Sequence, residues 1–231
     1  MSIAENIQQI RQRIEEAAKA AGRNGEEIIL VGASKMNDAA ACREAIAGGI
    51  DVLGENRVQE MTEKLSQNAY DGAPLHFIGH LQRNKVKQVV GKVSLIQSVS
   101  STALLDEIEK VAAKMDLVQD ILLEVNVGGE EAKSGFAPEA VEEAVRYART
   151  LPHISLRGLM TIPPIAVEQG ANIPYFERIH ALFVDIGEKM YDNKWEYISM
   201  GMSDDYAEAV RCGANMVRVG SAIFGARNYT K

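Results

Sequence analysis

The chain has 231 residues, of which 46% are hydrophobic and 25% charged, so it is long enough to form one large domain with a buried core. A formal net charge of -7 argues against a broad nucleic-acid surface, because phosphate binding depends on clustered Lys and Arg. No apolar run approaches the length of a membrane span, and the N-terminus lacks the apolar core of a signal peptide. We therefore expect a single cytoplasmic domain over residues 1–231, with neither nucleic acid nor membrane as a partner.

A long amphipathic helix is predicted at the N-terminus. Ser2 followed by Glu5 matches a capping box, and isoleucines then recur at spacings of four and three residues until the helix ends near Gly22. This helix precedes the first predicted strand, so we expect it to pack outside the repeated units that follow.

Eight apolar segments, each followed by a helical pattern, make up the rest of the chain. The predicted strands are residues 28–31, 51–55, 75–78, 93–99, 120–127, 155–160, 197–200 and 216–219. The predicted helices are residues 39–47, 57–65, 84–90, 104–115, 138–149, 175–190, 204–211 and a final turn in SAIFGAR. Regular alternation implies parallel strands, and eight units predict an α/β protein with a (β/α)8 TIM barrel. An open doubly wound sheet would also alternate, but the GxGxxG fingerprint is missing after the first strand.

The first candidate site is the lysine of VGASK, directly after the first strand. Gly32, Ala33 and Ser34 leave room for a ligand beside Lys35. In parallel α/β folds the carboxyl ends of strands face the ligand, and a partly desolvated lysine there can attack an aldehyde to form a Schiff base. The alternative is that Lys35 only marks where a buried strand reaches water.

Two loops near the end of the chain occupy the positions at which barrels often bind phosphate. In SMGMSDD, Gly201 allows close backbone approach and Ser203 offers a hydroxyl and an N–H at a helix start. In RVGSAIFG, the amides of Gly220 and Ser221 would point at an anion. A simple turn is the alternative for each glycine, but the pair of loops together favours an anion site.

Two polar residues could contact a pyridine ring placed between the lysine and the phosphate loops. Arg218 would donate to the ring nitrogen and keep it unprotonated, which makes the ring a poor electron sink. Asn56, after the second strand, could bind the ring substituents. The alternatives are an ordinary salt bridge for Arg218 and helix capping for Asn56.

Other chemistry-bearing residues do not form a convincing site. His76 and His80 are four residues apart, but this spacing converges only on a helix, and the segment is predicted as strand and turn. Cys42 and Cys212 lie outside any CxxC pattern and are predicted as buried thiols. We therefore predict no metal site, and the spacing supports no Ser-His-Asp or Cys-His arrangement.

Taken together, these motifs resemble the pyridoxal phosphate homeostasis protein family. The segments in family order are VGASK, GENRVQE, HFIGHLQRNK, the KSG loop, GLMTIPP, SMGMSDD and RVGSAIFG, which cover nearly the whole chain. The resemblance implies an alanine racemase-like barrel with pyridoxal 5'-phosphate, the vitamin B6 cofactor, held as a Schiff base on Lys35. The other cofactor-binding residues that it implies are Asn56, Met200, Gly201, Met202, Ser203, Arg218, Gly220 and Ser221.

The chain departs from the family pattern directly after the candidate lysine. SKMNDA stands where the family commonly has SKTKP, so a second basic residue and a proline are missing there. A role for a lysine at that point is not carried over, whereas cofactor binding is unaffected. Lys85 and Lys133 remain as either surface groups or groups that help to hand the cofactor on.

The function implied by the resemblance is non-catalytic homeostasis of pyridoxal phosphate. Such a protein holds the cofactor and supplies it to pyridoxal phosphate-dependent apo-enzymes, and we expect a monomer or weak homodimer. Racemases of this fold need a second base on the far face of the ring, often from an added β-domain, whereas this chain ends at Lys231 soon after the barrel closes. The alternatives are an amino-acid racemase or decarboxylase using Tyr175, Tyr206 or a loop, and a barrel isomerase acting on a phosphorylated sugar.

Overall fold

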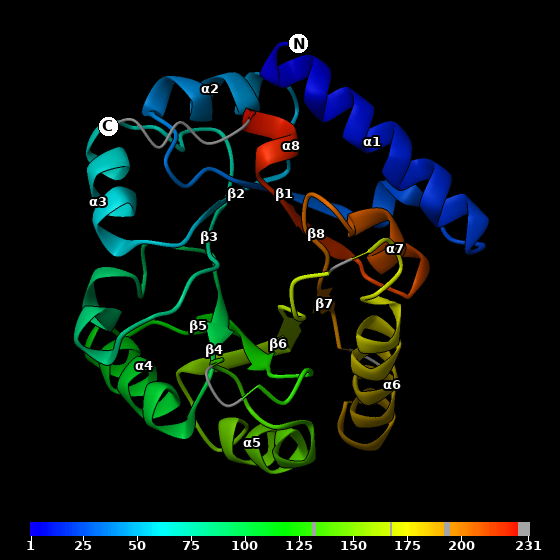
Figure 1. The fold of residues 1–231 in the computed structure, drawn as a ribbon. Helices are drawn as coiled ribbons and strands as arrows, with labels where there is room; N and C mark the ends of the chain where they lie inside the picture. The colour runs from blue at the N-terminus through cyan, green and yellow to red at the C-terminus, as the bar shows by residue number, and fades with distance from the viewer. Residues whose placement is uncertain (131–132, 167, 192–194, 226–231) are drawn as a thin grey trace.

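The computed structural model describes residues 1–130, 133–166, 168–191 and 195–225. Eight parallel strands close into a barrel in which β1 pairs with β8 (Figure 1). The strands are β1 (Ile29–Ala33), β2 (Val52–Glu55), β3 (Leu75–Phe77), β4 (Leu95–Val99), β5 (Gln119–Val125), β6 (Ile154–Thr161), β7 (Tyr197–Ser199) and β8 (Met216–Val219). The predicted barrel is confirmed, while the expectations that rest on Lys231 and the end of SAIFGAR lie outside the described residues.

Helices surround the ring of strands (Figure 1). The α-helices are α1 (Ile3–Ala20), α2 (Ala39–Ala47), α3 (Val58–Ser66), α4 (Thr102–Lys114), α5 (Val141–Ala148), α6 (Ile173–Met190), α7 (Tyr206–Arg211) and α8 (Ser221–Phe224). The 3₁₀ helices are η1 (Gly25–Glu27), η2 (Arg83–Gln88) and η3 (Pro138–Ala140).

Two predicted α-helices differ in the structure. The segment predicted as α-helix 84–90 is the 3₁₀ helix η2, which ends at Gln88 and buries Val86. The helix predicted from Pro138 starts as η3, and regular α5 begins only at Val141. Both differences concern helix type and boundaries, and the order of elements is unchanged.

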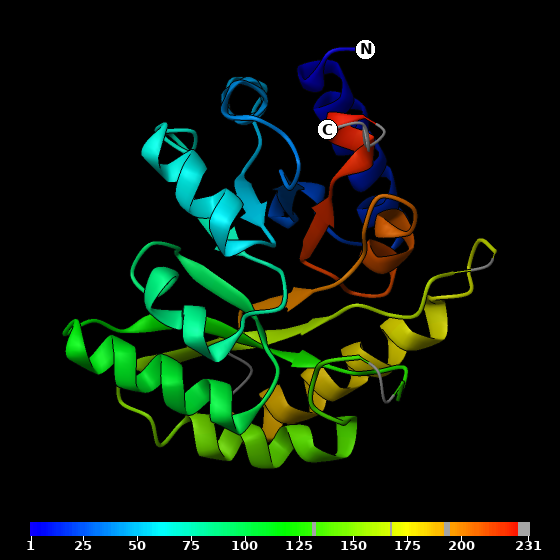
Figure 2. The same ribbon diagram turned by 60° about the vertical axis from the view of Figure 1, so that its left-hand side comes forward.

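The extra N-terminal helix is confirmed and lies over the closure of the barrel. Ser2 N donates to Glu5 Oε2 at 2.7 Å, and Glu5 N donates to Ser2 Oγ at 3.2 Å, so the capping box forms as predicted. Helix α1 packs against α2, α7 and α8, and its position beside α8 is clear in Figure 2. Asn6 Nδ2 donates to Ile223 O at 2.8 Å, which ties the start of the chain to α8.

The interior of the barrel contains both apolar and polar side chains. Its apolar cluster comprises Val31, Val52, Leu95, Leu122, Met160 and Met216. Alternate residues of a strand share one face. Polar residues that lie two positions along a strand from this cluster, or from an apolar residue packed against it, therefore also point into the interior. These buried polar residues are His76, Gln97, Glu124, Ser199 and Arg218.

Three sequence expectations concern features away from the barrel interior. Within the described ranges, no helix combines the length and the apolar character that crossing a membrane requires. Both cysteines are free thiols; Cys42 is buried as predicted, but Cys212 is only half-buried because it follows α7 beside an open hollow.

Candidate cofactor site

A cavity of about 270 Å³ opens at the carboxyl ends of the strands and joins the first part of the barrel to the last. The predicted cofactor-binding residues that line it are Lys35, Asn56, Met202, Ser203, Arg218, Gly220 and Ser221. Met200 and Gly201 were also predicted but do not line it. Met200 is fully buried, and a Cβ at Gly201 would lie 2.6 Å from Ala209 Cβ, so this glycine permits close approach to α7.

The backbone on the strand side of Lys35 is fixed by several hydrogen bonds. Ser34 N donates to Gly54 O at 3.0 Å, and Ser34 Oγ donates to Glu55 Oε1 at 2.6 Å. The ammonium group of Lys64 donates to Ser34 O at 2.8 Å. Each main-chain and side-chain polar group of Ser34 is thus engaged directly before Lys35.

The residue after the lysine is held as well. Met36 has a φ of 63°, a left-handed conformation that non-glycine residues adopt rarely. Its N–H donates to Glu60 Oε2 at 2.8 Å, and Asn37 Nδ2 donates to Lys35 O at 3.0 Å. The MNDA departure from the family pattern is therefore accommodated in an ordered turn that aims Lys35 at the cavity.

Sequence reasoning missed the buried ionic group behind this lysine. Glu55 is 0% exposed, and its Oε1 lies 2.6 Å from Lys64 Nζ and 3.1 Å from Tyr70 OH. Burial and the carboxylate of Glu55 raise the pKa of the Tyr70 hydroxyl. The available signal was an acidic residue closing the short apolar run VLGE, since a buried carboxylate needs partners.

The two glycine-containing loops meet at the hydroxyl of Ser203. Gly220 N donates to Ser203 Oγ at 3.2 Å, and Ala222 N points at the same oxygen from 3.4 Å. Met202 N donates to Asp205 Oδ1 at 2.6 Å, which fixes the first loop. Amides that converge on one oxygen next to a cavity are suited to a phosphate oxygen.

Arg218 lies beneath these loops and is 4% exposed. Its Nη1 donates to Ser199 Oγ at 2.6 Å and its Nη2 donates to Thr161 O at 2.8 Å. Burial lowers the pKa of the guanidinium to about 10, against the opposing influence of Asp205 and Glu124, so it stays charged at neutral pH. The ordinary salt bridge considered for Arg218 is not formed with any described carboxylate.

Asn56 presents a buried acceptor without a partner. Its Oδ1 has no hydrogen bond among the described residues, although buried amide oxygens are normally paired. The helix-capping alternative is wrong, because the residue that caps α3 is Arg57. An orphaned oxygen on the cavity wall fits a donor group of a bound ring.

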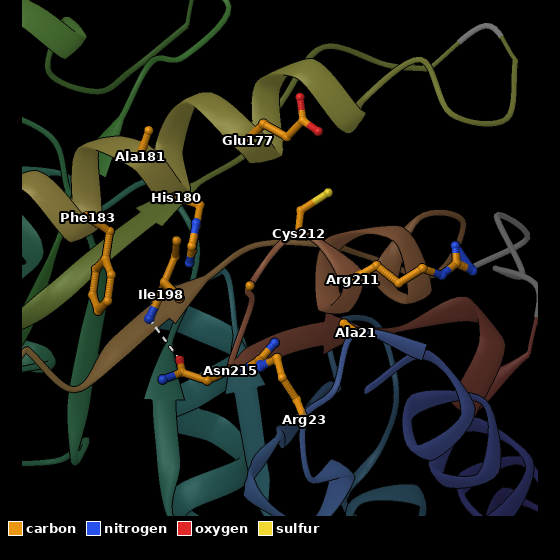
Figure 3. A pocket seen from close by; sticks show the side chains of 11 residues that line it. Ala21, Arg23, Glu177, His180, Ala181, Phe183, Ile198, Arg211, Cys212 and Asn215 are labelled. Atoms are coloured by element: carbon orange, nitrogen blue, oxygen red, sulfur yellow. Dashed lines mark hydrogen bonds between the residues drawn. The ribbon is translucent and has the colours of Figure 1, made fainter. Parts of the chain in front are cut away.

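A larger hollow of about 630 Å³ lies outside the barrel, between α6 and α7 (Figure 3). Glu177 and His180 of α6 face Cys212 across it. Arg23 also lines it, but Nη1 of this residue already donates to the carbonyls of Val210 and Ala214, each at 2.8 Å. The hollow has no lysine among its lining residues, so it does not match the chemistry expected for an aldehyde cofactor.

Comparison with known proteins places the chain in a family. Residues 2–228 match the family model for the alanine racemase N-terminal domain. The pyridoxal phosphate homeostasis protein of Aquifex aeolicus is 42% identical over 229 residues, which cover 99% of this chain and 100% of that protein. This chain belongs to the pyridoxal phosphate homeostasis protein family. The family assignment made from the motifs is confirmed, and the Escherichia coli K12 member is 34% identical over 99% of this chain and 98% of its own length.

Solved structures of similar proteins agree with this family and fold. A protein from Bifidobacterium adolescentis has a TM-score of 0.90 and 32% identity, covering 96% of this chain and 94% of its own. PipY of Synechococcus elongatus, solved with pyridoxal phosphate bound, has a TM-score of 0.83 and 28% identity over 97% of this chain and 100% of its own. Alanine racemase of Clostridium difficile has 16% identity and a TM-score of 0.73, covering 99% of this chain and 58% of its own, which shows the shared fold.

Proposed function

We propose that this family member binds pyridoxal phosphate through Lys35 and acts in pyridoxal phosphate homeostasis, as a reserve that supplies the cofactor to apo-enzymes in the cytoplasm. The observation that carries the proposal is the convergence of Lys35, Asn56, Arg218 and the Ser203 loop on one cavity. The names of its relatives and the pyridoxal phosphate bound to PipY support the same cofactor.

Each part of the cofactor has a matching group on the cavity wall. Pyridoxal phosphate supplies an aldehyde that condenses with a lysine amine, and Lys35 is the lysine that lines the cavity. The amides of Gly220 and Ser221 and the hydroxyl of Ser203 would bind the phosphate. Arg218 places a positive charge at the ring nitrogen, and Asn56 Oδ1 accepts from a ring substituent.

The composition of the cavity wall favours a carrier over a racemase or decarboxylase. Among the described lining residues Asp204 has the one carboxylate, so it is the residue that an enzyme using this cavity would need as its second base. Tyr175 and Tyr206, the candidate second bases, do not line the cavity, and Tyr206 is buried. A charged Arg218 at the ring nitrogen also opposes its protonation, so we expect carbanion formation to be slow.

Reconstitution with pyridoxal phosphate tests the binding proposal. Wild type is expected to show a visible absorption band and, after borohydride reduction and proteolysis, a mass increase on the peptide that contains Lys35. Lys35→Ala should lose both signals, whereas Lys92→Ala, which changes an exposed lysine, should keep them. Retention of covalent cofactor in reduced Lys35→Ala would show that another lysine is used.

A separate pair of assays tests the carrier role. The loaded protein should restore activity to a pyridoxal phosphate-dependent apo-enzyme, and it should neither decarboxylate an amino acid nor change the L/D ratio in a panel of racemase and decarboxylase substrates. Size-exclusion chromatography with light scattering tests the expected monomer or weak homodimer. Robust turnover of any amino acid would replace the carrier by an enzyme.

A further inference from the structure

A series of buried polar side chains crosses the barrel interior, where branched apolar residues usually pack. Arg218 Nη1 donates to Ser199 Oγ at 2.6 Å, and Ser199 Oγ donates to Gln97 Oε1, also at 2.6 Å. Gln97 Nε2 lies 2.9 Å from His76 Nδ1. The series joins β8, β7, β4 and β3, and no member is more than 6% exposed.

The hydrogen bonds of this series run in one direction, starting from the guanidinium of Arg218. A guanidinium has N–H donors and no acceptor, so Ser199 Oγ must accept from it. The single hydroxyl proton of Ser199 then goes to Gln97 Oε1, which leaves the amide nitrogen of Gln97 facing His76. Because this nitrogen only donates, His76 Nδ1 is unprotonated and the proton of the neutral imidazole is on Nε2.

The surroundings of His76 agree with a neutral ring. Burial lowers the pKa of His76 from 6.5 to about 4. The ring lines a separate cavity of about 310 Å³ at the end where the strands begin, together with Asp51 and Asp120. Both carboxylates are already paired, with Arg11 and Arg157 respectively.

A competing partner makes the orientation of Arg218 important. Glu124 is a buried carboxylate whose Oε2 has no hydrogen-bond partner among the described residues, and it attracts Arg218 electrostatically. The bonds to Ser199 and to Thr161 O hold the two terminal nitrogens of the guanidinium in place. Without the hydroxyl of Ser199, Nη1 loses this acceptor and the guanidinium is free to turn towards Glu124.

We propose that Ser199, Gln97 and His76 are positioning residues that fix the guanidinium of Arg218 and the charge it presents to the cofactor ring. The role at the ring rests on the proposed function, whereas the direction of the series is a property of the protein alone. The two statements are therefore tested separately.

Nitrogen NMR of the cofactor-free protein tests the direction of the series. His76 is expected as the Nε2–H tautomer between pH 6 and pH 8, and a proton on Nδ1 would overturn the proposal. In Gln97→Glu, a carboxylate replaces the donor that faces the ring, so a proton should appear on His76 Nδ1. An unchanged His76 signal in a folded Gln97→Glu protein would also contradict the series.

Cofactor titrations test the positioning role. Ser199→Ala removes one hydrogen bond to a charged group and should weaken pyridoxal phosphate binding roughly tenfold. It should also shift the pH midpoint of the visible band, which a general loss of stability would not do. Ser199→Thr keeps the hydroxyl and should restore both values, and Ser94→Ala, which removes a hydroxyl bound to Leu75 O, should change neither.

The outcomes separate the two proposals. Wild-type affinity and an unchanged pH midpoint in Ser199→Ala would refute the positioning role. If Ser199→Ala does not fold, the wild-type tautomer and Gln97→Glu decide the matter. Absence of cofactor from Lys35 together with the expected His76 tautomer would count against the proposed function and leave the directed series intact.

Discussion

Replacing Lys64 by methionine tests the buried ionic group behind the candidate lysine. Lys64 Nζ lies 2.6 Å from Glu55 Oε1, and the two side chains are 8% and 0% exposed. Lys64→Met keeps the chain length but leaves the Glu55 carboxylate buried without a cation. Removal of one partner from a buried ion pair costs about 3–5 kcal/mol. Because Ser34 Oγ and Tyr70 OH still donate to Glu55, we expect a loss near the lower value, about 3 kcal/mol.

Urea unfolding followed by circular dichroism measures this loss. Lys110→Met is the matched control, because Lys110 pairs with Glu107 across 3.1 Å on an exposed face of α4. Exposed pairs contribute less than about 1 kcal/mol, so the control should be nearly neutral. Thermal unfolding should show a fall of about 6–12 °C for Lys64→Met, since about 1 kcal/mol corresponds to about 2–4 °C in a protein of this size.

A second variant separates the buried charge from lost packing. Glu55→Gln added to Lys64→Met removes the uncompensated carboxylate and should recover more than about 1 kcal/mol of unfolding free energy. The reasoning would be refuted by a Lys64→Met protein as stable as Lys110→Met, or by a double variant less stable than Lys64→Met. Since Lys64 also holds Ser34 O, we expect Lys64→Met to bind pyridoxal phosphate more weakly.

Three further variants test the electrostatics and the glycine contact at the site. Burial raises the pKa of Glu124 from 4.5 to about 7, so the unfolding free energy of wild type falls as the pH rises through this range. Above pH 7, Glu124→Gln should have an unfolding free energy up to about 3 kcal/mol higher than wild type, as measured by urea titration. The pKa of His76 is lowered to about 4, so its contribution to the unfolding free energy is complete above pH 6.5 and is lost as the pH falls towards 4. His76→Gln should reduce the loss of unfolding free energy over this pH range by about 3 kcal/mol. An equal dependence on pH in wild type and His76→Gln would contradict this prediction. Gly201→Ala places a Cβ 2.6 Å from Ala209 Cβ, whereas a Cβ at Gly49, which has a similar positive φ, meets no atom within 4 Å. Gly201→Ala should therefore lower the unfolding free energy by about 1–3 kcal/mol more than Gly49→Ala.

The barrel could be predicted from sequence because its signals are local. The capping box at Ser2, the helix 39–47 and the strand 216–219 are set by neighbouring residues, and each was found. Lys35 and the Ser203 loop could also be placed, because barrel topology brings the carboxyl ends of all strands to one rim. The resemblance of the motifs to a known family then indicated pyridoxal phosphate as the cofactor.

The contacts that organise the site depend on which residues meet across the barrel, and the sequence does not show this directly. Lys64 has the pattern of an exposed helix residue, four positions after Glu60, yet it reaches inward to Glu55 and Ser34. Gln97 and Ser199 are 102 positions apart and bond only because β4 and β7 face the same interior. Met200 and Gly201, which precede the lining residues Met202 and Ser203, stay predictions as cofactor-binding residues.

The two halves of the cavity come from opposite ends of the chain, and this has a consequence for biosynthesis. The segment with Lys35 leaves the ribosome well before the loops at Ser203 and Ser221 and before α8, whose Ile223 O accepts from Asn6. Until then β1 lacks its β8 neighbour, and the amides of Gly220 and Ser221 have not yet joined Lys35 at the cavity. On the proposed function, the cofactor site is therefore complete only after β8 and the loops of Ser203 and Ser221 have been synthesised and folded.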